Sequence, residues 1–260
     1  MISKVKTSIT SLRDGLGSAV SQSTKSQPTP TRPAQFLSQT KPSANLDQFG
    51  IRCIYKSNPE GRVITNPDTR FFTRHYRSGN ADDPTVECTL DSKTPIINQE
   101  CTATIKMNGM IHPDTIDRKL RGGRHSSDNG GKDGICYSLE IMSDGSQDMY
   151  LEVERPHPSM HNCSKFCKPL FKLPDISNSK FGWKGIVINC TDSKSVHIES
   201  WINLTVEDQS KWQKYVDITD TGQLPQGLIL HCIGTRATIR IDGIKGRPEF
   251  SAVSMREITL

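Results

Sequence analysis

Apolar and polar residues alternate in short runs along most of the chain, a pattern typical of strands with one buried and one solvated face. In the run ATIRID at 237–242, Ala237, Ile239 and Ile241 fall on one side of an extended chain and the polar residues on the other. Similar runs predict strands at 51–56, 70–76, 85–90, 101–107, 135–142, 149–155, 183–190, 196–204, 212–216, 228–233, 237–242 and 253–259.

Turn-forming pairs separate these runs, and the Asp144-Gly145 pair between two alternating segments is the strongest hairpin signal. No long segment past residue 50 has the three- and four-residue spacing of an amphipathic helix. About a dozen strands with such turns predict an all-β fold, a two-sheet antiparallel sandwich of the jelly-roll kind, over residues 47–260.

The N-terminal segment has a different pattern. Apolar residues recur at helical spacing within 1–20, at Ile2, Val5, Ile9, Leu12, Leu16 and Val20. This stripe predicts a short amphipathic helix, with a mostly disordered tail as the alternative, because a lone helix of this length is marginal in water. Residues 21–46 are rich in Ser, Thr, Pro and Gln and carry too little apolar surface to fold, so a disordered linker is expected there.

Composition and charge narrow the class of protein. Only 33% of the 260 residues are hydrophobic, and no run approaches the ~20 apolar residues of a transmembrane helix. The net charge of +5 is spread along the chain, so nucleic acid is not a predicted partner. No signal peptide is evident, yet eight cysteines and glycosylation triplets at Asn162, Asn189 and Asn203 would suit an extracellular or virion-surface setting. The compartment and the redox state of the cysteines stay open.

The hairpin around Asp144 carries the strongest candidate chemistry. Residues two apart on a strand share a face, so Glu152 and Glu154 project together beside Tyr150, with Glu140 on the partner strand. His157 comes shortly after Glu154 in the sequence. Because glycoside cleavage uses a pair of carboxyl groups or an equivalent acid and base, the candidate catalytic residues are Glu152, Glu154 and His157. The alternative is a solvated strand face with alternating charges.

A second polar strand and a glycine-rich loop add candidate ligand-binding residues. On the strand at 196–204, His197, Glu199 and Trp201 share one face, and an aromatic ring beside polar groups suits a sugar. A tryptophan half-buried under a loop would give the same pattern. The loop at 121–134 would bring basic residues over a binding face. The candidate ligand-binding set is Arg121, Arg124, His125, Glu140, Tyr150, His197, Glu199 and Trp201.

Metal and cofactor signals are weak. The run His157-x3-His161-x-Cys163-x3-Cys167 lacks the usual spacing of zinc ligands, so no metal ligands are assigned and no cofactor is predicted. Calcium could bind acid-rich turns, although no EF-hand pattern is present. The acidic residues of those turns are Asp128, Asp133, Asp144 and Asp148.

The order of short motifs resembles concanavalin A-like (LamG/glucanase-type) jelly-roll domains, above all uncharacterised archaeal and environmental members. The motifs are DQFGIRCIY at 47–55, GGRH at 122–125, EVERPH at 152–157, WKG at 183–185, VHIESW at 196–201, TIRIDG at 238–243 and SMREI at 254–258. The resemblance implies a jelly roll whose concave sheet faces carbohydrate. The Glu-x-Asp-x-x-Glu strand of laminarinase-like glucanases is absent, because no Asp lies between Glu152 and Glu154. The resemblance therefore implies binding rather than catalysis.

Three functional hypotheses follow. The first is a lectin-like, glycan-recognising domain. Its binding face would carry the loop at 121–134 together with Glu152, Glu154, His157, Glu199 and Trp201. The second is an enzyme, a polysaccharide lyase or hydrolase that acts on acidic glycans, with Glu154 or His157 as the base. The third is a structural jelly-roll subunit of a viral capsid or surface assembly, in which residues 1–46 form an arm that joins homo-oligomer subunits. Carbohydrate, acidic if the basic loop residues contact it, is the expected partner of the first two.

Overall fold

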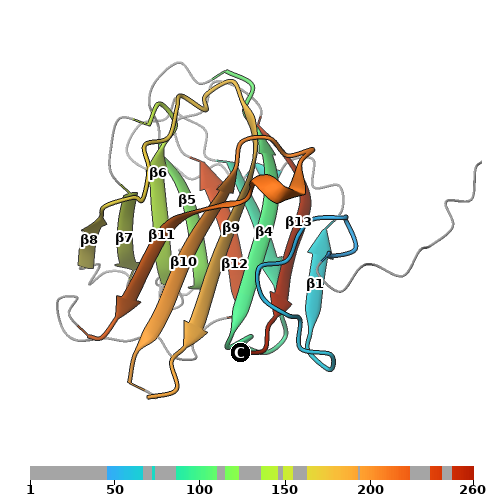
Figure 1. The fold of residues 1–260 in the computed structure, drawn as a ribbon, viewed down its shortest axis with the longest axis vertical. Coiled ribbons are helices and arrows are strands. Elements are labelled where there is room, and N and C mark those ends of the chain that lie inside the picture. The colour runs from blue at the N-terminus through green and yellow to red at the C-terminus, as the bar shows by residue number, and fades with distance from the viewer. Residues whose placement is uncertain are drawn as a thin grey trace, which may run out of the picture. The chain divides into compact units, whose positions relative to one another are not determined.

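Two antiparallel β-sheets make up the domain in the computed structural model (Figure 1). The structure describes residues 46–66, 72–73, 86–109, 115–122, 136–145, 149–154, 163–192, 194–222, 235–241 and 248–260. The helix expected at 1–20, the linker at 21–46 apart from Leu46, and the strand at 228–233 lie outside these residues. No α-helix occurs within the described ranges, and none of their helices is long and apolar enough to cross a membrane.

The first sheet has six strands in the order β1-β13-β4-β9-β10-β11. Their bounds are β1 Val63–Asn66, β13 Glu249–Glu257, β4 Gln99–Lys106, β9 Lys180–Asn189, β10 Val196–Asn203 and β11 Gln213–Asp220. Every neighbouring pair is antiparallel. A short 3-10 turn, η2 (Gln209–Lys211), lies between β10 and β11.

The second sheet has seven strands in the order β2-β3-β12-β5-β6-β7-β8, again all antiparallel. Their bounds are β2 Phe72–Thr73, β3 Val86–Asp91, β12 Arg236–Ile241, β5 Thr115–Gly122, β6 Cys136–Met142, β7 Met149–Glu154 and β8 Cys163–Cys167. The hairpin predicted around Asp144-Gly145 is the β6–β7 pair.

The core lies between the sheets, and alternate residues of each strand supply it. Ile105, Trp183 and Ile198 come from the six-stranded sheet, and Leu139 and Ile239 come from the seven-stranded one; each is at most 2% exposed. All five belong to one continuous apolar cluster. The predicted fold class, an all-β two-sheet sandwich, is confirmed.

Two polar links cross this core. Arg118 of β5 donates to the backbone carbonyl of Trp183 in β9 at 2.8 Å, and its guanidinium lies 5.0 Å from the Trp183 ring centroid. Burial lowers the pKa of Arg118 to about 10. Tyr137 of β6 donates its hydroxyl to Asp220 of β11 at 2.7 Å. The inward position of Arg118 explains why alternation did not predict β5: a charged residue occupies the place where the pattern calls for an apolar one.

The predicted strand at 51–56 is wrong. Residues 46–57 instead form a strap that belongs to neither sheet. It has two isolated bridges, one within the strap between Leu46 and Arg52 and one between Ser57 and Ile258. The strap begins with a turn in which Asp47 Oδ1 accepts the backbone N–H groups of Phe49 and Ile51, both at 2.9 Å. Its later N–H groups bond to side chains of the six-stranded sheet rather than to a neighbouring strand, which is why the segment is not a strand.

Candidate functional site

A buried ion triad anchors the strap to the outer face of the six-stranded sheet. Glu100 of β4 pairs with Lys184 of β9 at 3.1 Å and with Arg256 of β13, and all three side chains are 0–3% exposed. The Glu100 carboxylate also accepts the backbone N–H groups of Ile54 and Tyr55 at 3.1–3.2 Å. Burial lowers the pKa of Lys184, and Glu100 opposes that shift. The triad is a structural junction with no exposed group to offer a ligand.

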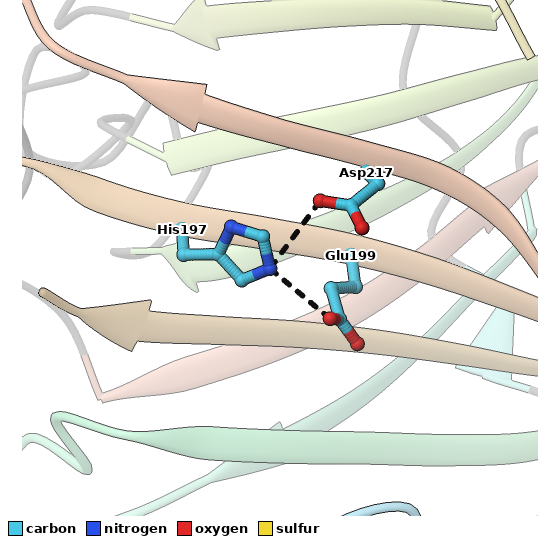
Figure 2. Close-up of side chains that lie close together, drawn as sticks. All are labelled: His197, Glu199 and Asp217. Carbon is cyan, nitrogen blue, oxygen red and sulfur yellow. Dashed lines mark hydrogen bonds and ion pairs between the residues drawn. The ribbon is translucent and has the colours of Figure 1, made fainter. Parts of the chain in front are cut away.

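Beside the triad, on the same face, six side chains form what we call the Glu199 cluster, and Figure 2 draws three of them, His197, Glu199 and Asp217. Its members are Tyr55, His197, Glu199, Trp201, Lys214 and Asp217. They come from the strap, β10 and β11. The register of these strands places Glu199 opposite Asp217 and His197 opposite Thr219.

Four donors converge on the Glu199 carboxylate, whose side chain is 2% exposed. One oxygen accepts from the Tyr55 hydroxyl at 3.1 Å, lies 3.0 Å from His197 Nε2, and accepts from Lys214 Nζ at 2.7 Å. The other accepts the Trp201 indole N–H at 2.7 Å. Lys214 also pairs with Asp217 at 2.7 Å. The cluster thus joins strap and sheet through one carboxylate.

These contacts set the charge states of the cluster. Burial alone would raise the pKa of Glu199, but hydrogen bonds from His197, Lys214 and Trp201 outweigh it and lower the pKa to about 2. The bond to Glu199 raises the pKa of His197 against its partial burial. Burial and the Glu199 charge raise the pKa of Tyr55 to about 12. A carboxylate held ionised in this way is unsuited to serve as a general acid or base near neutral pH.

The outer face of the seven-stranded sheet carries the second group of polar residues, which we call the polar face. Two rows cross four adjacent strands in register. One row is Glu87, Arg240, Asp117 and Glu140; the next is Thr89, Thr238, Lys119 and Ser138. Glu87, Asp117 and Lys119 are only 5–7% exposed. Charged groups with so little exposure are fixed in orientation, unlike those of an ordinary solvated strand face.

The structure divides the residues that sequence reasoning grouped into one site. Register places Tyr150 opposite Glu140 and Glu152 opposite Ser138 on the neighbouring strand β6. Glu154 lies opposite Cys136, one step further along β7. His197, Glu199 and Trp201 lie on the outer face of the other sheet, because Val196 and Ile198 of the same strand are in the core. One face that holds Glu152, Glu154, Glu199 and Trp201 together is therefore ruled out.

The remaining predicted site residues are either buried or half-buried in structural contacts or lie outside the described residues. Arg121, 1% exposed and with a φ of 51°, donates to the carbonyl of Ile97 and so braces the loop before β4. Trp201 is half-buried, as the alternative reading of its strand anticipated, and Lys214 Nζ lies 5.4 Å from its ring. Arg124, His125 and His157 lie outside the described residues, so the catalytic roles of Glu152, Glu154 and His157 stay predictions.

The sequence did not predict three members of the Glu199 cluster. Lys214 and Asp217 lie in or just past the predicted strand at 212–216, but nothing local indicates that this strand pairs with β10. Tyr55 is 144 residues distant from Glu199. The sequence also suggested a glycosylation site at Asn203, but in this fold its side chain is not accessible for attachment of a glycan. The Asn203 side chain is buried, donates to the Asp208 carbonyl at 3.0 Å and accepts the Thr205 N–H at 2.8 Å.

Comparison with known proteins finds no matching family model and no matching curated protein. Several solved structures have a similar fold. The carbohydrate recognition domain of Emp47p has a TM-score of 0.45 and 10% identity, covering 75% of this chain and 95% of that one. The Ca2+-bound exoplasmic/lumenal domain of VIP36 has 0.41 and 12%, covering 84% and 89%. The carbohydrate binding module CBM66 from Bacillus subtilis has 0.40 and 8%, covering 73% and 96%. The likeness concerns the fold alone.

Proposed function

We propose that this domain recognises carbohydrate, and that the polar face of the seven-stranded sheet is its binding surface. The observation that supports the proposal is the pair of polar rows across β3, β12, β5 and β6. Sugar hydroxyls both donate and accept hydrogen bonds, so they are best held by donors and acceptors that alternate at fixed spacing. The rows place a cation among acceptors: Arg240 lies between Glu87 and Asp117, and Lys119 lies between Thr238 and Ser138.

Strands hold such groups more rigidly than loops do, and a rigid set of polar groups loses little entropy when a ligand binds. Tyr150, opposite Glu140 at the end of one row, is an aromatic residue of the type that packs against the apolar face of a sugar ring.

The charge of the polar face favours a neutral sugar or an amino sugar over the acidic glycan that the basic loop suggested. The two rows contain three carboxylates, Glu87, Asp117 and Glu140, against two cations, Lys119 and Arg240. A uronate or sulfated sugar would meet this excess of like charge, which costs binding energy in a poorly solvated site. Calcium stays a separate prediction: of the four acidic turn residues considered for it, only Asp144 lies within the described residues.

Glycan-array binding of the full chain, followed by titration calorimetry with the best neutral oligosaccharide, tests the proposal. The half-buried residues Glu140 and Arg240 allow a double variant that removes both charges, Glu140→Gln with Arg240→Gln. Loss of two charged hydrogen-bonding groups should weaken binding at least about tenfold. Asp217→Asn on the opposite face is the matched control and should bind as the wild type does. Unchanged affinity in the double variant, or no binding to any glycan, would refute the proposal.

A further inference from the structure

The geometry points to a second binding site, on the outer face opposite the polar face: His197, Glu199 and Asp217 can hold a transition-metal ion of the zinc type. Each residue offers one ligand atom, and all these atoms lie within 4.8 Å of one another. Figure 2 shows the His197 imidazole of β10 directed toward the carboxylates of Glu199, on the same strand, and Asp217, on β11. Imidazole nitrogen with carboxylate oxygen is a donor set that suits zinc, copper or nickel.

The two separations from the imidazole nitrogen are close to those around a small tetrahedral ion. His197 Nε2 lies 3.0 Å from Glu199 Oε1 and 3.4 Å from Asp217 Oδ1. A tetrahedron with bonds of about 2.0–2.1 Å has edges of about 3.3 Å. Without a metal the same separations serve hydrogen bonds, so binding requires that Nε2 give up its proton and that the Lys214 ammonium leave the two carboxylates. Calcium fits poorly, because it prefers six to eight oxygen ligands at longer distances.

The surroundings of the three residues are those of an oriented metal site. In known sites, the second nitrogen of a ligating histidine usually bonds to a neighbouring group that fixes the ring. Here His197 Nδ1 lies 3.2 Å from the Thr219 hydroxyl. The second oxygen of Glu199 accepts the Trp201 indole N–H at 2.7 Å. The third ligand, Asp217, is 39% exposed and His197 is 25% exposed, so an ion can enter from solvent.

Lys214 is an internal competitor for the ion. Its ammonium lies 2.7 Å from both Glu199 and Asp217, between the carboxylates that the metal would share. The lysine side chain is long, flexible and 29% exposed, so it can swing into solvent when an ion arrives. Its departure leaves two carboxylates to neutralise the two charges of the metal. Lys214 therefore lowers the affinity of the site without abolishing it.

Titration of the full chain with zinc or cobalt(II), after treatment with a chelator, tests the inference, and the visible and near-ultraviolet spectrum of cobalt(II) separates nitrogen–oxygen ligation from ligation by thiolates. We expect one ion per chain with no thiolate band. His197→Ala should weaken binding at least about 100-fold, and Asp217→Asn and Thr219→Val about tenfold each. Lys214→Met should tighten it several-fold.

Glu207→Gln is the matched control, because Glu207 forms an exposed pair with Lys180 that contains no histidine; its affinity should equal that of the wild type. Asp217→Asn alters only an exposed side chain and keeps the test valid if His197→Ala fails to fold. The inference is wrong if neither ion binds, if the spectrum shows only thiolate ligation, or if His197→Ala and Asp217→Asn bind as tightly as the wild type.

Discussion

Replacing Glu100 by glutamine should destabilise the domain far more than any exposed charge replacement. The Glu100 carboxylate is the shared partner of two buried cations, Lys184 and Arg256, and it accepts two backbone N–H groups of the strap. A neutral amide has the same shape but leaves both cations without their counter-ion in a site that is at most 3% exposed. It also has a single acceptor oxygen where the carboxylate has two.

The expected cost follows from that burial. Removing one partner of a buried ion pair typically costs about 3–5 kcal/mol, because the remaining charge is left desolvated. With a urea m-value of about 2–3 kcal/mol/M for a domain of this size, the unfolding midpoint should fall by about 1–2.5 M. Lys184→Met should cost less than Glu100→Gln, since Glu100 then keeps Arg256 as its partner.

Urea unfolding followed by circular dichroism measures both changes. Glu249→Gln is the control: Glu249 and Lys106 form a pair that is about half exposed, and such pairs contribute at most about 1 kcal/mol. If Glu100→Gln shifts the midpoint no further than Glu249→Gln does, the triad does not anchor the strap to the six-stranded sheet. If Lys184→Met costs as much as Glu100→Gln, the carboxylate is not the shared partner of both cations.

Three more predictions concern the same sheet. Gly182→Ala should lower stability by about 1–3 kcal/mol in urea unfolding, because its new Cβ would lie 2.6 Å from the Trp212 ring; an unchanged midpoint would contradict this packing. Tyr55→Phe removes a hydroxyl bonded to Glu199, so the strap should be cleaved faster in limited proteolysis and about 1–2 kcal/mol of stability should be lost; equal cleavage rates would count against it. The lowered pKa of Glu199 stabilises the fold above about pH 4.5, and up to about 3 kcal/mol is lost as the pH falls from there toward the folded value of about 2. The stability gap between wild type and Glu199→Gln should therefore narrow over that window, and a gap independent of pH would contradict the assignment.

Local pattern was enough to predict the fold class and many of the strands. The alternation at 237–242 became β12, and the segments around Asp144-Gly145 became a paired hairpin. It failed at β5, where Arg118 occupies a core position, and at the strap, whose N–H groups bond to side chains. In both places a long-range polar contact replaces the apolar contact or strand pairing that local rules assume.

The candidate site was harder to predict, because alternation shows which residues of one strand share a face but not which sheet the strand joins. The β10 residues and the β6–β7 hairpin were grouped because each strand pattern presents polar residues on one face and because of the family resemblance, but the two groups belong to different sheets. The β10–β11 register also shifts between Ser200 and Trp201, which no sequence rule announces. The partners of Glu199 are therefore visible only once the strands are paired.

The two hydrogen bonds that cross the core bear on how the sheets stay aligned. Apolar packing is not directional, so by itself it opposes translation or rotation of one apolar sheet face against the other only weakly. The bond from Arg118 to the Trp183 carbonyl fixes one point of contact, about which a sheet could still pivot. The bond from Tyr137 to Asp220 fixes a second point, on a different pair of strands. A second fixed point opposes that rotation, so these two bonds help to hold the sheet that carries the polar face in register with the sheet that carries the Glu199 cluster.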